Sequence, residues 1–415
     1  MKLVKRRLGD IAQIIGGATP STKIPEYWDG GIPWITPKDL SGFEGIFIRE
    51  GSRNISKVGL EHSSARILPA GTVLYTSRAP IGYVAIASAP VTTNQGFKSL
   101  VLKDGYVPEF VYYLLKHSKA EIESFSSGGT FAEISAKALA EVELEIPDER
   151  HQRTVADILL NLDSKILENQ KISKSLESIA QTIFKSWFID FDPVKAKMAG
   201  EKPVGMDDAT AALFPDSMED SELGPIPLGW KFGTLEEACL ILDSKRVPLS
   251  GAERKKRPGE IPYFGATGIL DFIDSHLFEG PHVLVGEDGS VITKNGTPFV
   301  QYVWGKFWVS NHAHVLQGSG GFSVEQLKLF LDRIQISNYV TGAVQPKLNQ
   351  GNLKSIPCLL PAVKVSDAFN LIIGPMFDEI RVLSEQTKLL VEIRDRLLPR
   401  LISGELQIPD EMLVS

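Results

Sequence analysis

The sequence has few cysteines and no long hydrophobic run. Only Cys239 and Cys358 occur among 415 residues, far apart and without metal-ligand spacing, so we expect two buried thiols in a reducing cytoplasm. No stretch of 18 or more apolar residues is present, which argues against a membrane-spanning helix and a membrane partner. The basic N-terminus, Met1–Arg7, lacks the apolar core of a signal peptide. The sequence therefore predicts a cytoplasmic protein.

Catalytic signatures are also missing. The sequence has no GxxxxGK[ST] phosphate-binding loop, no HExxH zinc motif and no Pro-Pro pair, so the Pro-Pro-aromatic motif of DNA amino-methyltransferases is absent. Phe264–Gly268 is glycine-rich but lacks a strand-to-helix context, and we interpret it as a turn. His312 and His314 share one side of a predicted strand, but without a third ligand nearby hydrogen-bonding histidines are favoured over a metal half-site. We predict no catalytic residue and no metal.

Negative charge is in excess but unevenly distributed. The formal net charge of −7 argues at first against a polyanionic partner. Residues 190–230, however, hold nine acidic residues against three lysines and so account for most of that charge. The flanking segments are close to neutral and can still carry local basic faces.

The most ordered pattern in the sequence is a stretch that occurs twice. Residues 147–188 and 361–402 carry apolar residues three and four positions apart, as on one helix face, and an offset of 214 aligns them without a gap. About 40 residues make a helix of roughly 60 Å. The predicted helix–helix seam consists of Val155, Leu159, Leu162, Ile166, Leu176, Ile179, Ile183, Phe369, Ile373, Met376, Ile380, Leu390, Ile393 and Leu397. A coiled-coil dimerisation arm is one interpretation, but the ungapped repeat favours a spacer between two like domains.

The rest of the chain divides around these helices. Short β-branched and aromatic runs between Gly and Pro predict strand-rich domains on both sides of an acidic connector. The predicted segments are a first strand-rich domain (1–146), a first long helix (147–189), a Pro/Gly-rich connector (190–230), a second strand-rich domain (231–360), a second long helix (361–403) and a frayed C-terminal tail (404–415). The predicted fold class is α+β with a pseudo-twofold internal repeat.

Short motifs support a repeat of the strand-rich domains as well. Three pairs correspond: Ile32–Trp34 with Ile261–Tyr263, Val91–Asn94 with Trp308–Asn311, and Gly129–Ile134 with Ala343–Leu348. A protein with near-twofold repetition suits a two-part target, as symmetric binders do on DNA.

Basic and amide side chains gather near predicted strand ends, and these side chains read base edges in DNA. The candidate DNA-binding residues are Lys38, Ser77, Arg78, Asn94, Gln95 and Lys98 in the first domain, and Lys245, Arg246, Arg254, Lys255, Lys256, Arg257, Lys294, Asn295 and Lys347 in the second. A solvated loop explains Arg254–Arg257 equally well, and a buried turn-maker explains Asn94 equally well. Both interpretations stay open at this point.

Several longer motifs carry a family resemblance over nearly the whole chain. They are Gly16–Thr22 with Tyr27 and Trp28, Ile32–Lys38, Ser77–Gly82, Thr93–Phe97 and Phe184–Asp192. Together with the order domain, helix, domain, helix, they make the sequence resemble the specificity (S) subunit of type I restriction–modification systems.

The resemblance implies two target-recognition domains, each reading half of a split site in double-stranded DNA. It also implies that the two long helices pack antiparallel as a coiled-coil ruler and dock the modification (methyltransferase) subunits, two of them in our expectation. Restriction subunits would join through the modification subunits. S-adenosylmethionine, ATP and Mg²⁺ are expected only on those partners, and the specificity subunit itself carries no catalytic residue and no cofactor.

Two alternatives belong to other functional classes. One is a coiled-coil scaffold with protein-binding domains, and the other is a self-contained methyltransferase or nuclease with unrecognised motifs. Sequence-specific DNA protection by the reconstituted complex argues against the scaffold. Binding of S-adenosylmethionine by the isolated chain supports the enzyme.

Overall fold

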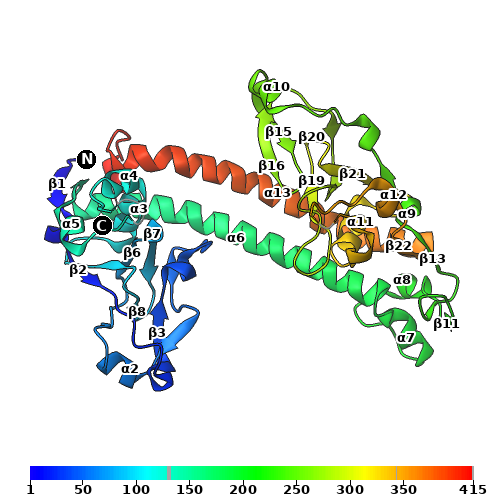
Figure 1. The fold of residues 1–415 in the computed structure, drawn as a ribbon, viewed down its shortest axis with the longest axis horizontal. Helices are drawn as coiled ribbons and strands as arrows, with labels where there is room; N and C mark the ends of the chain where they lie inside the picture. Colours follow the sequence, from blue (N-terminus) through cyan, green and yellow to red (C-terminus); the bar gives the residue numbers. More distant parts are fainter. Residues whose placement is uncertain (129–131, 343, 414–415) are drawn as a thin grey trace. The chain divides into compact units, whose positions relative to one another are not determined.

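A computed structural model describes residues 1–128, 132–342 and 344–413. The chain divides into two compact units, Met1–Gln170 with Glu385–Ser415 and Lys171–Ser384. Each unit combines a strand-rich part with portions of two long helices (Figure 1), which confirms the predicted α+β fold class. Among the described residues, no helix is long and apolar enough to cross a membrane.

The first unit is built on a five-stranded sheet of order β2-β9-β6-β7-β4. Its strands are Ala12–Gly16, Lys98–Leu102, Val73–Ser77, Ile81–Ala87 and Phe47–Ile48. A second sheet, β5-β3-β8, contains Arg53–Ile55, Trp28–Ile35 and Thr92–Thr93. Helix α3 (Pro108–His117) buries Phe110 and Leu114 in the core of this unit, and its proline suits the first turn of a helix.

The second unit repeats this plan. Its first sheet has the order β14-β21-β18-β19, with strands Cys239–Ile241, Ala313–Gly318, His282–Gly286 and Val300–Val303. Its second sheet has the order β16-β15-β20-β17, with strands Ile269–Ile273, Pro258–Phe264, Lys306–Val309 and Phe278–Glu279. The parallel pairing of β15 with β20 matches that of β3 with β8. Helix α11 (Val324–Leu331) follows β21 as α3 follows β9.

Two helices of 40 residues run through both units. They are α6 (Glu149–Phe188) and α13 (Val363–Ile402). In the first unit Asp163 on α6 pairs with Arg394 on α13 at 2.7 Å, and Asn169 Nδ2 lies 3.4 Å from Gln386 Oε1. Because the residue numbers on α13 fall as those on α6 rise, the two helices are antiparallel in this unit, as expected. In the second unit the rings of Phe184, Trp187 and Phe188 surround Phe369.

The predicted seam is wrong at two positions. Ile179 and Ile393, which the offset of 214 relates, are 47% and 45% exposed, whereas Ala180 and Phe184 are buried. A seam repeating every 3.5 residues drifts on a straight helix of 3.6 residues per turn, so the buried stripe moves on by one position after several turns. The other predicted seam residues are buried or half-buried.

The connector and the tail are more ordered than the sequence indicates. The connector contains α7 (Asp192–Met198), α8 (Asp208–Ala212), β11 (Met218–Glu219) and β12 (Ile226–Pro227). The prediction of a frayed tail is wrong, because Ile408 is buried and Leu406 and Leu413 pack against the core of the first unit. Apolar side chains in both segments account for this order, because their burial is favourable.

Both cysteines are buried free thiols, as predicted. Burial raises the pKa of Cys239 and of Cys358 to about 12 in each case, so neither thiol is reactive near neutral pH.

Candidate nucleic-acid interface

A small ion-pair cluster lies where β6 ends in the first unit. Glu133 accepts from Arg78 Nη1 at 3.3 Å and from Lys98 Nζ at 3.3 Å. Arg78 and Glu133 are each a little over one-third exposed, while the Lys98 side chain is mostly buried. A pocket of about 650 Å³ lies beside Arg78 and Glu133. Arg78 is therefore available at the surface, and Lys98 acts as the buried counter-ion of Glu133.

Two other predicted residues hold the backbone of this region. Ser77 is fully buried and donates its hydroxyl to the Gly96 carbonyl at 3.1 Å, so its predicted contact with DNA is wrong. Asn94 Oδ1 accepts from the Gly96 amide at 2.9 Å, which is the turn-making role left open above. The neighbouring Gln95 is exposed and accepts from the Thr19 hydroxyl.

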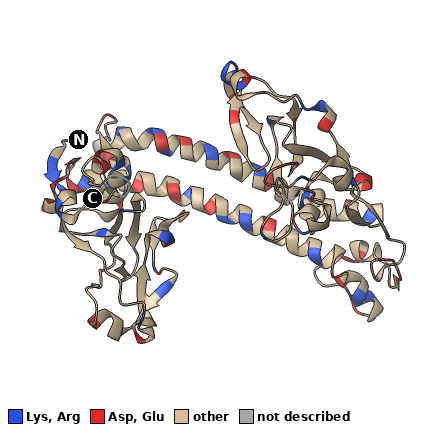
Figure 2. Ribbon diagram, viewed as in Figure 1, with Lys and Arg blue, Asp and Glu red and all other residues tan. Residues whose placement is uncertain are grey.

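The basic stretch of the second unit begins in a short helix and ends in the turn that follows it, at Lys256 and Arg257. Helix α10 (Gly251–Lys255) is capped by Ser250, and Figure 2 shows its cationic cluster. Arg254 pairs with Asp271 at 3.1 Å and lies over the Tyr263 ring. Arg257 pairs with Asp274 at 2.9 Å and lies over the Trp308 ring. The two arginines therefore fix the helix and the turn after it, because their charges and planar faces are already engaged.

Several of the predicted cationic and amide residues are exposed to solvent. They include the lysines Lys38 beside β3, Lys245, Lys255, Lys256, Lys294 and Lys347, and the amide residue Asn295. Exposed ammonium groups suit phosphate contacts, which position a duplex without reading its sequence.

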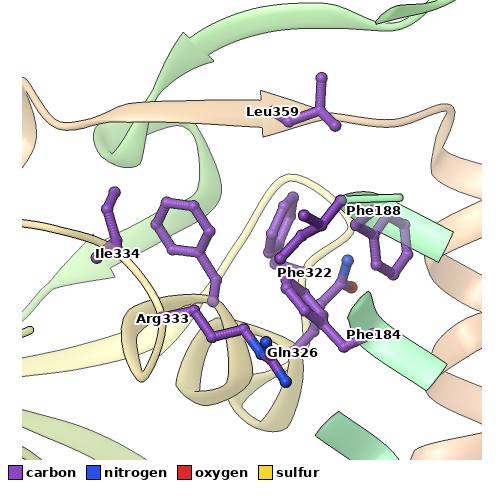
Figure 3. Close-up of a pocket in the computed structure, with 9 residues that line it drawn as sticks. Phe184, Phe188, Phe322, Gln326, Arg333, Ile334 and Leu359 are labelled. Carbon is purple, nitrogen blue, oxygen red and sulfur yellow. The ribbon is translucent and has the colours of Figure 1, made fainter. Parts of the chain in front are cut away.

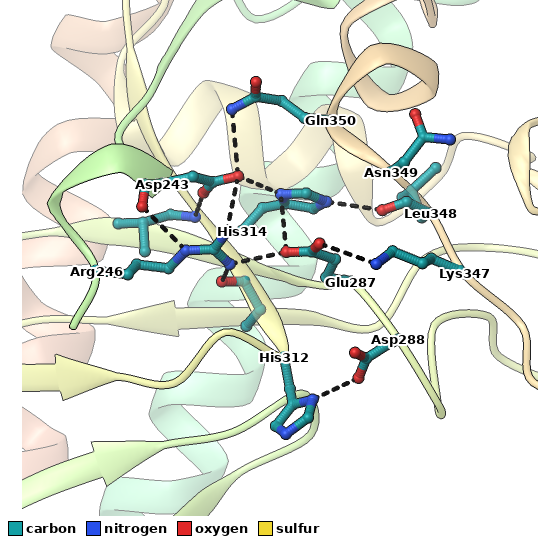
Figure 4. Close-up of polar contacts among 12 residues, drawn as sticks. Asp243, Arg246, Glu287, Asp288, His312, His314, Lys347, Leu348, Asn349 and Gln350 are labelled. Atoms are coloured by element: carbon teal, nitrogen blue, oxygen red, sulfur yellow. Dashed lines mark hydrogen bonds and ion pairs between the residues drawn. The ribbon is translucent and has the colours of Figure 1, made fainter. Parts of the chain in front are cut away.

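A denser polar network occupies the equivalent strand ends of the second unit (Figure 4). Arg246 Nη1 lies 2.9 Å from Glu287 Oε2, and its Nη2 lies 3.4 Å from Asp243 Oδ2. His314 Nδ1 lies 2.5 Å from Asp243 Oδ2, and Lys347 Nζ lies 3.6 Å from Glu287 Oε1. The Arg246 side chain is only 13% exposed, so its predicted contact with DNA is wrong: the two carboxylates bury and neutralise it.

The carboxylate of Asp243 is stabilised in its charged form. Burial by itself would raise the pKa of Asp243, but the hydrogen bond and electrostatic interaction with His314, the amide of Val315 and the positive charge of Arg246 outweigh it and lower that pKa. The network therefore fixes three strand ends through charge-assisted bonds.

The same residues also have the composition of a metal site. Atoms of Asp243, Glu287 and His314 lie within 4.8 Å of one another, which supplies the ligands that sequence reasoning did not find. Both nitrogens of His314 are engaged, however, since Nε2 lies 2.8 Å from the Leu348 carbonyl. Arg246 already neutralises the carboxylates, and His312 points to Asp288 instead. The donor set fits an ion-pair network and does not fit a metal ion.

An apolar pocket of about 160 Å³ lies near the end of α6 (Figure 3). Phe184, Phe188 and Phe322 line it together with the buried side chain of Gln326. The Oε1 atom of Gln326 has no hydrogen-bond partner among the described residues. Sequence reasoning did not predict this pocket, because its aromatic residues read as ordinary core positions.

Sequence reasoning also missed the acids of both clusters. Glu133, Asp243 and Glu287 each organise neighbouring cations, but a search for base-reading cations and amides passes over carboxylates. One signal was present: Glu133 and Lys347 are aligned by the offset of 214, so a charge reversal at one repeated position was visible in the sequence.

Two like strand-rich units with cations at their strand ends, joined by two long helices, define a duplicated recognition protein. The chain belongs to the family described as "Type I restriction modification DNA specificity domain", whose model matches residues 2–178 and 227–366.

Similar proteins agree with this assignment. The chain is 35% identical over 425 residues to the type I restriction enzyme MjaIX specificity subunit of Methanocaldococcus jannaschii, covering 98% of this chain and 94% of that protein. It is 25% identical to the HindI specificity subunit of Haemophilus influenzae, covering 72% and 78%. The crystal structure of the type I restriction–modification S subunit from M. genitalium has the same fold, with a TM-score of 0.61, 16% identity and coverage of 97% and 96%. The chain is a DNA-recognition specificity subunit and is not itself an enzyme.

Proposed function

We propose that this subunit reads a bipartite DNA target, with one half-site for each strand-rich domain. The observation that carries the proposal is the duplication itself: the strand order β2-β9-β6-β7 corresponds to β14-β21-β18-β19, and β5-β3-β8 corresponds to β16-β15-β20. Cationic side chains lie near corresponding strand ends in both units. Exposed lysines would hold phosphates, and polar groups at the strand ends would read bases. The domain boundaries for this division are 1–146 and 231–360.

The long helices have two roles in this proposal. They set the distance between the half-sites, and they dock two modification subunits. Exposed apolar side chains on α13 support docking, since Leu371 is 79% exposed, Leu389 is 59% exposed and Val382 is 49% exposed. Restriction subunits would join through the modification subunits, which would also hold S-adenosylmethionine, with ATP and Mg²⁺ on partner subunits. We expect the complex to act in the cytoplasm.

Exchange of residues 1–146 for the matching domain of a relative tests the proposal. The complex carrying this exchange should methylate a motif in which one half-site is new and the other is unchanged. Sequencing of methylated bases in host DNA, with the parental complex as control, provides the measurement. A change in both half-sites would contradict modular reading.

A further inference from the structure

The two strand-rich domains repeat one backbone frame at the ends of β6 and β18. In the first domain Ser77 donates its amide to the Gly96 carbonyl at 2.7 Å, and its own carbonyl accepts from the Ile134 amide at 3.1 Å. In the second domain Glu287 makes the same two bonds, to His312 at 2.8 Å and from Leu348 at 2.9 Å. Ser77 and Glu287 are therefore structurally equivalent.

A second set of bonds extends the frame. Ser127 and Glu133 exchange two backbone hydrogen bonds of 3.0 Å each, and Thr341 and Lys347 exchange two bonds of 2.8 and 2.7 Å. Glu133 and Lys347 thus occupy one position in two copies of the same bridge. The strand registers add a further pair: Ala12 faces Leu102 and Cys239 faces Gly318, which makes Lys98 equivalent to His314.

The side chains on this common frame have opposite charge. In the first domain Glu133 lies between Arg78 and Lys98, both at 3.3 Å. In the second domain the equivalent Lys347 lies 3.6 Å from Glu287, which replaces Ser77 (Figure 4). The charged groups of Glu133 and Lys347 each pair with a mostly buried side chain of opposite charge. Lys98, the partner of Glu133, is 14% exposed, and Glu287, the partner of Lys347, is 16% exposed.

Stability alone does not account for this arrangement. The heads of Glu133 and Lys347 are 38% and 49% exposed, and ion pairs of this exposure contribute little to folding. The buried partners instead fix the position of the Glu133 carboxylate and of the Lys347 ammonium group beside the strand ends. Defined placement of a half-exposed polar group is what recognition of a base edge requires.

We infer that position 133/347 specifies one base in each half-site, with opposite hydrogen-bonding chemistry in the two domains. The carboxylate of Glu133 accepts from the exocyclic amino group of a cytosine in the first half-site. The ammonium group of Lys347 donates to O6 and N7 of a guanine in the second half-site. The inference rests on the proposed function, because it requires each domain to read its own half-site.

The test uses the complete complex with its modification subunits and maps methylated motifs in host DNA. Glu133→Gln should relax one base pair of the first half-site, with discrimination reduced about 5- to 100-fold there and the second half-site unchanged. Lys347→Gln should relax one base pair of the second half-site alone. Both substitutions nearly preserve side-chain size and leave the backbone bridge in place.

Matched controls separate recognition from charge. Glu143→Gln in the first domain and Lys354→Gln in the second each remove an exposed ion pair away from the frame, with Arg7 and Glu236 respectively. These variants should methylate the parental motif with parental selectivity. Competition binding of each reconstituted complex against DNA randomised at single positions measures the same discrimination without cleavage or host effects.

Other outcomes overturn the inference. Unchanged selectivity in both variants would leave position 133/347 as a surface ion pair. Failure of the Glu133→Gln chain to assemble with its modification subunits would assign this residue to assembly and not to reading. If the exchange of residues 1–146 still changes one half-site, either result removes only this inference and leaves the proposed function intact. A failure of that exchange would remove both.

Discussion

Asp243 accepts three hydrogen bonds at the centre of the second unit's polar network. His314 Nδ1 lies at 2.5 Å, the Val315 amide at 3.0 Å and Gln350 Nε2 at 3.3 Å. Because the interactions with His314 and the Val315 amide, together with the nearby charge of Arg246, lower the pKa of Asp243 in the folded state below its ordinary value of 3.8, folding favours the charged form. The carboxylate therefore stabilises the fold above pH 3.8, and this contribution is lost as the pH falls through the lowered folded pKa.

The substitution Asp243→Asn tests this linkage. At pH 7 it should reduce the free energy of unfolding of the full chain by about 3 kcal/mol, because it leaves buried positive charge without its partner. Denaturant melts repeated at decreasing pH should show the difference between parent and variant shrinking below pH 3.8, because the parental carboxylate is protonated first in the unfolded state and, at lower pH, in the folded state. A difference that stays constant down to the lowest pH would contradict the assignment.

At the scale of elements, α13 exposes apolar side chains that its own fold does not need. Leu371 is 79% exposed, while Phe369, two residues earlier, is fully buried among aromatic rings. Substitutions at these two positions therefore distinguish an effect on docking from an effect on folding. A partner that covers Leu371 gains from burying it, since about 25 cal/mol is gained per Å² of apolar surface removed from water.

We expect Leu371→Glu to weaken binding of the modification subunit about 10-fold or more while changing the stability of the isolated chain by less than about 0.5 kcal/mol. Phe369→Ala, as the contrasting variant, should cost about 3–5 kcal/mol of stability. Glu379→Gln at another exposed position of α13 serves as the matched control. Titration of the labelled chain with modification subunit gives the affinities. If the Leu371→Glu variant binds with parental affinity, Leu371 is not part of the docking surface.

The elements were more predictable than their contacts. Helices α6 and α13 end at Phe188 and Ile402 as the periodicity predicts, because a 3.6-residue repeat over many turns is a strong local signal. The exposure of Ile179 follows from the 3.6-residue turn of a straight helix, because a prediction that keeps one fixed repeat along the whole helix does not allow for this drift.

Side-chain partners depend on tertiary register, which the sequence does not display. Sequence alignment pairs Asn94 with Asn311, but the backbone pairs it with Ser310, since both amides bond the equivalent carbonyls of Ile35 and Phe264 at 2.9 Å. The ion pairs of Glu133 and Glu287 could be identified only from the strand registers that bring these acids to their cations. An alignment error of one residue, Asn311 in place of Ser310, was enough to conceal which residues are structurally equivalent.

At the scale of the whole molecule, net charge limits what the subunit does alone. Its formal charge is −7, whereas phosphate neutralisation supplies most non-specific affinity for DNA. We expect the isolated chain to bind target duplex weakly and the complex with modification subunits to bind it tightly. Anisotropy titrations of both at about 50 mM and about 200 mM salt provide the comparison. Nanomolar, sequence-specific binding by the isolated chain would contradict this expectation.

The central claim is that the helices set the gap between two half-sites. Each helix is continuous in the chain across the residue at which the two units are divided, Gln170 in α6 and Ser384 in α13, so a heptad can be inserted after each. Seven residues add roughly 10 Å to a helix and keep its apolar face in phase. At 3.4 Å per base pair, this length equals about three base pairs.

Methylome sequencing of cells expressing the doubly inserted subunit tests the claim most directly. We predict methylation of a motif with both half-sites unchanged and a gap longer by about three base pairs. Activity should fall, because three base pairs also rotate one half-site by close to a third of a turn. An active insertion variant that still methylates the parental motif with its original gap would contradict the helical ruler.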